Sequence, residues 1–452
     1  MSRPANLPVS RPTGLATTDG PPALPGVERL RLDNGLRVVL AEDRSATGVC
    51  VAVHYDVGFR SEPVGRSGFA HLFEHLMFEG SERVGTGLHG RHVQAAGGTF
   101  NGTTYRDHTA YHQVVPAEAL ERVLFLEADR MRAPRITAET LALQIAVVKA
   151  EILRNITAPP YGGFPWIPLP PALFTTYANT HNGYGDLADL ESSTLADCTA
   201  FFDTHYAPGN AVLTVCGDLD PAACAELVRR HFDGVPARPV PVRTPSADPW
   251  PTEDRQDDHL VPGLPMPALA LGLRLPDPVA DTDRYLAATV AGALLGDGET
   301  SLLHRSTVRD AGTAVTVHAG AGLTGVALEA RDPDVFVIRA MMAAPESAKA
   351  VADAAWDALR SLAEHGPDPA ALVRATARVA VEHHRRLDQL GSRALLYGRF
   401  ELHHGDAELA ADLPGRIRLI TPEAVACAAA ELARQPRRSV LLVPAPTPGD
   451  PR

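Results

Sequence analysis

The sequence predicts an α+β protein of at least two domains, each with antiparallel strands and helices. Three observations favour this class. The chain has 452 residues, which is more than one ordinary hydrophobic core organises. Alternating apolar runs and helical periodicity occur in both halves. A stretch rich in proline and charge, residues 236–265, separates the halves and has the composition of a linker.

These observations divide the chain into four parts. Residues 1–26 are rich in Pro, Gly, Ser and Thr, and we expect them to form a flexible arm. Residues 27–235 are expected to form the first α+β domain and residues 266–452 the second, with the linker at 236–265 between them.

The first domain is expected to open with strands and then enter a helix. An Asn-Gly pair at 34–35 lies between alternating runs, which is the strongest short hairpin signal. Another strand is expected over 47–57. A helix should then run between a start signal at 67–68 and a stop signal at Gly80.

The second half repeats this plan without a metal motif. Its sequence predicts a strand over 268–275, and helices over 281–295, 347–365 and 369–389.

The most informative motif is His-Leu-Phe-Glu-His at residues 71–75, inside the first expected helix. On a helix, His71, Glu74 and His75 share one face. Two imidazoles and a carboxylate so placed suit a zinc ion and a base, and the H-x-x-E-H order is the inverzincin signature. Apolar neighbours would bury the opposite face of the helix, so the polar face is expected to look into a cleft.

Catalytic zinc is typically held by three side chains, so a third ligand is needed. The best candidate is Glu151, in a segment with helical periodicity over 137–155. The interval from His75 is weak evidence by itself, because a ligand from a separate element has no fixed spacing. Gln144 shares a stripe of that helix with Glu151, where it would orient a ligand carboxylate. The alternative for Gln144 is an ordinary solvated or interhelix glutamine.

Composition excludes several classes of protein. A formal net charge of −12 argues against a nucleic-acid binder. Five scattered cysteines without C-x-x-C spacing indicate neither a disulfide framework nor a thiolate zinc site. The chain has no apolar run long enough to span a membrane. We therefore expect a cytoplasmic protein without a nucleic-acid or membrane partner, and its abundance of Ala, Arg and Pro indicates a bacterial source.

Four blocks of sequence resemble the M16 family of metallopeptidases, which includes pitrilysin, insulinase and mitochondrial processing peptidase. In chain order the blocks are 68–81 (Gly-Phe-Ala-His-Leu-Phe-Glu-His-Leu-Met-Phe-Glu-Gly-Ser), 97–111 (Gly-Gly-Thr-Phe-Asn-Gly-Thr-Thr-Tyr-Arg-Asp-His-Thr-Ala-Tyr), 126–131 (Leu-Glu-Ala-Asp-Arg-Met) and 147–151 (Val-Val-Lys-Ala-Glu). The similarity continues over 201–218, which includes an Ala-Pro-Gly-Asn turn and ends in Gly-Asp. The resemblance implies two homologous domains, each an antiparallel sheet packed with helices, as in the LuxS/MPP-like metallohydrolase duplication, and a half-length chain of the M16B type.

The resemblance also implies roles for individual residues. His71, His75 and Glu151 would hold one Zn²⁺ per chain, and Glu74 would be the general base of a zinc metalloendopeptidase. The alternative is a cluster on the surface of a helix without a metal, as in degenerate subunits of this family.

Residues 99–104 resemble the edge strand of the family, to which a peptide substrate adds as an extra strand. Thr99, Phe100 and Asn101 are therefore candidate substrate-binding residues. A turn or strand-edge role is the alternative for Asn101. For His108 and His112, outside the metal motif, we expect structural roles.

Family members also use an Arg and a Tyr of the second domain to hold substrate near the zinc. Leu302 and Val315 stand where this Arg and Tyr are expected. We therefore expect a heterodimer in which a related M16 chain supplies both residues. The alternative is a homodimer in which Arg305 or Arg309 serves instead.

The function predicted from these residues is that of a zinc-dependent endopeptidase that cleaves small peptides or unfolded leader segments. Two alternatives belong to other classes of protein: a non-catalytic structural subunit, and a peptide-binding module without cleavage.

Overall fold

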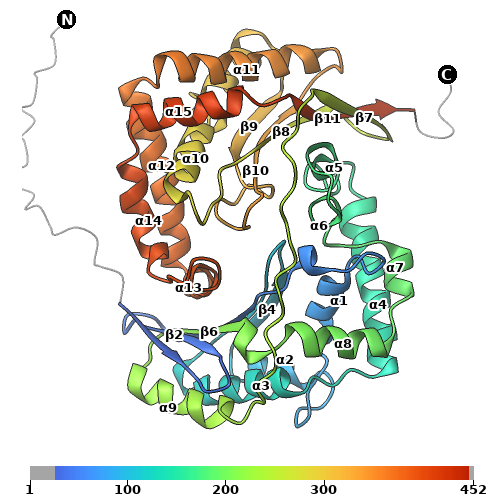
Figure 1. The fold of residues 1–452 in the computed structure, drawn as a ribbon, viewed down its shortest axis with the longest axis vertical. Helices are drawn as coiled ribbons and strands as arrows, with labels where there is room; N and C mark the ends of the chain where they lie inside the picture. The colour runs from blue at the N-terminus through green and yellow to red at the C-terminus, as the bar shows by residue number, and fades with distance from the viewer. Residues whose placement is uncertain (1–25, 447–452) are drawn as a thin grey trace, which may run out of the picture.

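Two β-sheets, one in each half of the chain, form the frame of the structure (Figure 1). It is a computed structural model and describes residues 26–446. The first sheet contains, in spatial order, β1 (Val27–Arg31), β2 (Arg37–Glu42), β6 (Ala211–Gly217), β3 (Val49–Tyr55), β5 (Thr109–Val115) and β4 (Thr99–Thr104). The second sheet contains β7 (Arg255–Pro262), β11 (Arg438–Ala445), β8 (Ala268–Arg274), β10 (Val335–Met341) and β9 (Thr316–Ala321).

Helices pack around both sheets. Those of the first half are α1 (Phe69–Leu76), α2 (Leu88–Ala95), α3 (Leu120–Arg132), α4 (Ala138–Ile152), α5 (Leu169–Leu173), α6 (Tyr177–Thr180), α7 (Leu187–Glu191), α8 (Leu195–His205) and α9 (Pro221–Phe232). Those of the second half are α10 (Thr282–Gly296), α11 (Ser347–His365), α12 (Pro369–Asp388), α13 (Leu390–His404), α14 (Leu409–Arg418) and α15 (Pro422–Ala433). The α+β class predicted from the sequence is confirmed. None of the described helices is long and apolar enough to cross a bilayer.

The two sheets have the same strand order once β1 is set aside. β2, β6, β3, β5 and β4 of the first sheet correspond to β7, β11, β8, β10 and β9 of the second. Each sheet also departs from a purely antiparallel plan at the same place, because β2 pairs with β6, and β7 with β11, in parallel. In both halves a helix follows the third of these strands in space: α1 follows β3, and α10 follows β8. The fold is therefore a duplication in which α10 is the counterpart of α1.

The expected elements around the His-Leu-Phe-Glu-His motif are present. The Asn-Gly hairpin joins β1 to β2 in antiparallel register. α1 lies between the two expected signals, and α4 occupies most of the expected helix at 137–155. In the second half, β8, α10, α11 and α12 each fall within one or two residues of the predicted range.

The segment 236–265 differs from a simple linker. Residues 236–254 contain neither helix nor strand, but β7 follows and pairs in parallel with β11. Most residues of β7 are exposed, so its sequence lacks the apolar alternation that predicts a strand. The strand is held instead by its main-chain hydrogen bonds to β11 at the edge of the sheet. Residues 1–25 of the expected arm lie outside the described residues.

The first sheet is covered on both faces, which joins the two halves of the chain. Successive side chains of a strand point to opposite faces. Val49, Val51 and Val53 of β3 belong to the core of the first half, whereas Cys50 and Ala52 belong to the core of the second. The helix responsible is α13, which packs on β3, β5 and β6 (Figure 1).

Buried polar contacts also join the halves. Arg60 donates to Asp107 Oδ2 at 2.9 Å, and the backbone N–H of Arg331 donates to the same oxygen at 2.8 Å. The Arg331 guanidinium in turn donates to Asp56 at 2.7 Å. The carboxylates come from the first half and Arg331 from the second, so these contacts fix one half against the other.

We expect Gly398→Ala in α13 to destabilise the protein, although alanine normally favours a helix by about 1 kcal/mol over glycine. A Cβ at this position would lie 2.3 Å from His54 Nδ1 and 2.9 Å from Thr214 Oγ1, both on the first sheet. Overpacking of this kind costs about 1–3 kcal/mol. The midpoint of urea unfolding should fall for Gly398→Ala. It should stay or rise for Gly415→Ala in α14, where nothing lies within 4 Å. Equal midpoints for both variants would contradict this packing.

Candidate metal centre

Three side chains from two helices converge at one point of the first half. His71 and His75 lie on α1, and Glu151 lies on α4. Glu151 Oε2 is 3.8 Å from His71 Nε2 and 3.5 Å from His75 Nε2. One ligand atom from each residue lies within 4.8 Å of the others, and no other such group of three or more occurs within 26–446. The structure thus brings together the three residues predicted as zinc ligands.

The spacing of these atoms suits a zinc ion. Ligand atoms about 2.0–2.2 Å from a tetrahedral zinc lie roughly 3.3–3.6 Å apart. The two His–Glu separations are close to that range and longer than a hydrogen bond of about 2.7–3.2 Å. Burial lowers the pKa of His71 to about 3, and His75 adds to this shift. The His71 imidazole is therefore neutral at pH 7, as a metal ligand must be.

Gln144 lies where a residue orienting a ligand was predicted, although it contacts a histidine and not the Glu151 carboxylate. Its Oε1 is 3.2 Å from His75 Nδ1. An N–H at Nδ1 that donates to this oxygen leaves the Nε2 lone pair directed at Glu151 and the metal position. Gln144 Nε2 in turn donates to Glu79. His71 Nδ1 is buried and has no hydrogen-bond partner among the described residues.

Local sequence explains why the two helices start where they do. Gly68 precedes α1 in the left-handed region, with φ of 87°. The carboxylate of Glu62 accepts hydrogen bonds from the backbone N–H groups of Gly68 and Ala70, at 2.9 and 2.8 Å. It thereby satisfies donors that a helix start leaves unpaired. α4 begins with a capping box between Thr137 and Thr140.

Glu74 lies beside the ligands on the same helix and faces strand β4. Thr104 Oγ1 of β4 donates to Glu74 Oε2 at 2.7 Å. Burial raises the pKa of Glu74 to about 7; the Thr104 hydrogen bond opposes this shift and the charge of Glu151 adds to it. A carboxylate with a pKa near neutrality suits a group that accepts a proton and later returns it.

If Glu74 serves as the base of a peptidase, as the motif predicts, Gly102→Ala should lower kcat and leave the metal ligands in place. A Cβ on Gly102 of β4 would lie 2.8 Å from Glu74 Cγ and 3.1 Å from Glu74 Oε1, so the carboxylate must move. Displacement of a catalytic group by about 1 Å costs roughly a hundredfold in rate. Peptide turnover and zinc content of this variant check the expectation. Gly415→Ala is the control, and unchanged kcat in Gly102→Ala would contradict the position of Glu74.

β4 is the edge strand of the first sheet, next to the metal centre. Thr99 and Asn101 are exposed, whereas the ring of Phe100 packs against Phe78 at 5.2 Å between centroids. Phe100 therefore presents its backbone and not its ring to the edge. The Asn101 side chain accepts from the N–H of Gly102 at 3.0 Å, within its own strand.

The two histidines expected to be structural lie outside the cluster. His112 is on β5, opposite Asn101 in the register. His108 is buried and stacks on Tyr105, with 4.5 Å between ring centroids.

Two further residues touch the cluster and were missed in the sequence. The ring of Tyr184 packs on His71 at 5.1 Å between centroids. Asn155 donates to Glu151 Oε1 at 3.3 Å. Asn155 follows Glu151 by one helical turn, and this spacing was a usable signal. Tyr184 comes from a loop, which has no periodicity to reveal it.

Leu302 and Val315, which stand where the family's Arg and Tyr are expected, differ in exposure from each other. Arg305 and Arg309 were the alternatives. Leu302 packs half-buried against the core of that half, and Val315 is 47% exposed. Arg305 and Arg309 are exposed, and Arg309 forms an ion pair with Asp310 at 2.9 Å.

Comparisons with known proteins place both halves of the chain in one family. A family model described as "Insulinase (Peptidase family M16)" matches residues 37–159, and one described as "Peptidase M16 inactive domain" matches residues 192–379. The two family models together cover parts of both halves of the duplicated fold. The chain belongs to the M16 peptidase family.

Curated relatives include both proteases and a subunit of a respiratory complex. The zinc protease PqqE of Helicobacter pylori is 30% identical over 63% of this chain and 64% of its own length. Cytochrome b-c1 complex subunit 1 of Bos taurus is 28% identical over 61% of this chain and 56% of its own length, so less than two thirds of either relative is matched. An uncharacterized zinc protease of Streptomyces coelicolor is 24% identical over 92% of this chain and 89% of its own length.

Solved structures share the fold. A protease from Helicobacter pylori superposes with a TM-score of 0.82 at 23% identity, and covers 94% of this chain and all of that one. Pitrilysin superposes with a TM-score of 0.75 at 19% identity, over 94% of this chain and 45% of that one.

Proposed function

We propose that this chain is a zinc-dependent endopeptidase that cleaves small peptides or unfolded leader segments. The observation that carries the proposal is the convergence of His71, His75 and Glu151 at zinc-ligand spacing, with Glu74 beside them. The zinc protease family of the relatives supports it.

The residues of this chain have distinct parts in such a reaction. His71, His75 and Glu151 would hold one Zn²⁺, which when bound polarises a carbonyl and makes water a better nucleophile at neutral pH. Glu74 takes a proton from the water whose oxygen bonds to the scissile carbonyl carbon. It then gives that proton to the amine as the C–N bond breaks, which leaves one free carboxylate and one free amine. Thr104 holds the Glu74 carboxylate toward β4 throughout.

The substrate would lie along β4 as an added strand. Its main chain would hydrogen-bond to the free edge at Thr99, Phe100 and Asn101. Because this mode binds backbone, selectivity for individual side chains along the strand is expected to be loose.

We further propose that the active form is a heterodimer with a related M16 chain. Leu302 and Val315 cannot supply the Arg and Tyr of the family pattern, so a partner would supply both. A homodimer that uses Arg305 or Arg309 is the alternative. Sedimentation and peptidase assays of the purified chain, alone and with a related chain, distinguish the heterodimer from the homodimer. Full activity of a dimer of this chain alone would exclude the need for a second chain.

A non-catalytic subunit is the second candidate function. The match to a domain described as inactive and the similarity to a subunit of the cytochrome b-c1 complex favour it. Metal analysis and a quenched-peptide assay on the same preparation decide between the peptidase and the non-catalytic subunit. About one zinc per chain with hydrolysis supports the peptidase. Less than about a tenth of an equivalent of zinc without hydrolysis, in the absence of chelators, supports the scaffold.

A further inference from the structure

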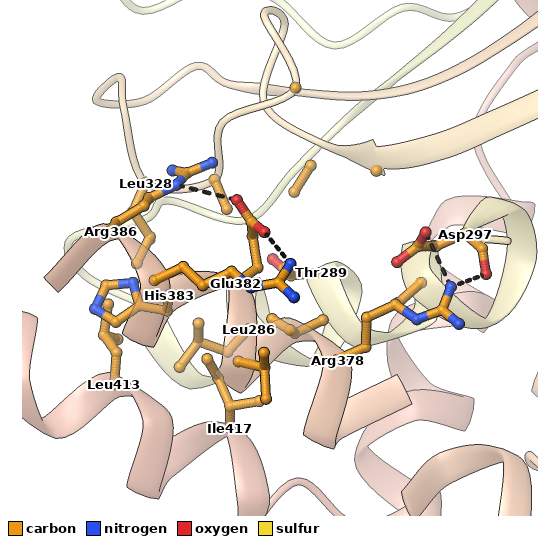
Figure 2. A pocket seen from close by; sticks show the side chains of 18 of the residues that line it. Leu286, Thr289, Asp297, Leu328, Arg378, Glu382, His383, Arg386, Leu413 and Ile417 are labelled. Atoms are coloured by element: carbon orange, nitrogen blue, oxygen red, sulfur yellow. Dashed lines mark hydrogen bonds and ion pairs between the residues drawn. The ribbon is translucent and has the colours of Figure 1, made fainter. Parts of the chain in front are cut away.

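The second half contains a cavity of about 680 Å³ at the position that corresponds to the metal centre (Figure 2). In the first half, α1 packs against β4 and α4. In the second half its counterpart α10 packs against β9, the counterpart of β4, and against α12. Residues of α10, β9 and α12 line the cavity, and α14 closes another side. At corresponding positions, the first half thus brings metal-competent side chains together, whereas the second half has a cavity.

The lining combines an apolar floor with arginine. Leu286 of α10 and Leu413 and Ile417 of α14 supply apolar surface (Figure 2). Four arginines also line the cavity, in a chain whose formal net charge is −12. They are Arg378, Arg385, Arg386 and Arg399. A cavity of this size and composition suits an amphipathic ligand that carries negative charge.

Three of these arginines have carboxylate partners. Arg378 lies 3.0 Å from Asp297 Oδ1. Arg385 and Arg386 each approach Glu382 at 3.8 Å. These pairs lie on the partly exposed rim, where an ion pair contributes little.

Arg399 differs from the other three. Arg399 is only 8% exposed. Within 26–446 its side chain forms no hydrogen bond and no ion pair, and its Nε atom is buried without a partner. Glu329 is the carboxylate whose charge acts most on it, but the two side chains form no ion pair within 4.0 Å. A guanidinium that lines a cavity and forms no ion pair of its own is suited to accept a carboxylate there, because pairing offsets the cost of burying its charge.

The cavity also lies near the proposed substrate path. Tyr105 directly follows β4, and the charges of both Glu74 and Arg399 act on its pKa, which burial raises. A second cavity, of about 350 Å³, shares Ala319, Gly320 and Gly325 with the first and is also lined by Trp166. The Trp166 ring lies 5.6 Å from that of Tyr184, which packs on His71.

We propose that this cavity binds a carboxylate of the peptide substrate, with Arg399 as its counter-ion, while another part of the same peptide lies at the metal centre. The inference rests on the proposed peptidase function and names its substrate class: peptides with an acidic side chain or a free C-terminal carboxylate beyond the cleaved bond. The apolar floor would contact the aliphatic part of the residue that bears the carboxylate.

Quenched peptides that differ only in charge test this with the unaltered enzyme and its partner chain, if one is required. One peptide has an internal Glu and a free C-terminus, a second has Gln in place of that Glu, and a third has a C-terminal amide. A charge-assisted hydrogen bond predicts that kcat/KM falls roughly ten- to hundredfold for the peptide that lacks the recognised carboxylate, mainly through KM. If kcat/KM falls for the Gln peptide, the acidic side chain is the recognised carboxylate; if it falls for the amide peptide, the C-terminal carboxylate is. Equal kcat/KM for all three peptides overturns the proposal.

Variants link the effect to Arg399. Arg399→Met should remove the difference between the charged and neutral peptides, and Arg399→Lys should keep part of it. Arg360→Met, an exposed arginine of α11 outside the cavity, is the control. If Arg399→Met fails to fold, the comparison of peptides still decides. Binding of the same labelled peptides to Glu74→Gln distinguishes failure of the peptidase proposal from failure of the cavity proposal. If binding depends on charge but the wild-type protein does not hydrolyse the peptides, only the peptidase proposal is contradicted. If the wild-type protein hydrolyses all peptides equally well, only the cavity proposal is contradicted.

Discussion

Glu74→Gln is expected to reduce kcat for peptide hydrolysis by about 10²–10⁴-fold, while zinc stays bound. Gln has the shape of Glu, so it retains the Thr104 contact at 2.7 Å, but its amide cannot take a proton from water. The converging ligand atoms belong to His71, His75 and Glu151, whereas the Glu74 carboxylate is held by Thr104 of β4. The expected result is therefore a loss of turnover with an unchanged metal content.

The comparison needs a matched variant and a clean readout. Glu82→Gln makes the same chemical change at an exposed position shortly after α1 and should keep wild-type kcat. Steady-state cleavage of a quenched peptide, with zinc measured on the same samples, gives both quantities. If Glu74→Gln cleaves as fast as Glu82→Gln, Glu74 is not the base.

Glu151→Gln should weaken zinc binding by more than about a hundredfold. Loss of a residue that only orients a ligand typically costs 10–100-fold in metal affinity, and Glu151 would contact the metal itself. Its Oε2 lies 3.5 Å from His75 Nε2 and 3.8 Å from His71 Nε2, and no other carboxylate within 26–446 belongs to this group of ligand atoms. Competition with a chromogenic zinc chelator measures the affinity.

A graded series makes this second expectation specific. Gln144→Ala removes the hydrogen bond to His75 Nδ1 and should lose about 10–100-fold in affinity, less than Glu151→Gln. Glu139→Gln, on the exposed first turn of the same helix, should lose nothing. Wild-type affinity in Glu151→Gln, or the reverse order of the first two variants, would contradict the proposed ligand set.

Local signals predicted much of the fold. The Asn-Gly pair specifies a tight turn between two strands, so the hairpin was readable without tertiary information. The helix around 71–75 was readable because capping and stop signals act within a few residues. The second half was predicted almost as well at β8, α10, α11 and α12, where apolar periodicity is long and regular.

What escaped prediction depends on contacts between distant segments. α13 covers the first sheet, so Cys50 and Ala52 of β3 are buried by residues of the other half. β7 is an edge strand held by β11 and has little apolar pattern of its own.

In the candidate site too, local signals predicted some residues, whereas others depend on contacts between distant segments. His71, Glu74 and His75 share a helix, so their convergence follows from the helical repeat. Glu151 lies on a separate helix, and its interval from the motif did not identify it without the family resemblance. Tyr184, and Arg399 beside its cavity, reach their positions only through the folded chain, and no local pattern singles them out.

The central claim is that one zinc ion lies between α1 and α4. Anomalous diffraction at the zinc edge, from crystals of the purified chain, tests it most directly. The expected result is a single strong peak about 2.0–2.2 Å from Nε2 of His71, Nε2 of His75 and a carboxylate oxygen of Glu151. A map without a peak at this cluster, from crystals grown with zinc present, would contradict the account.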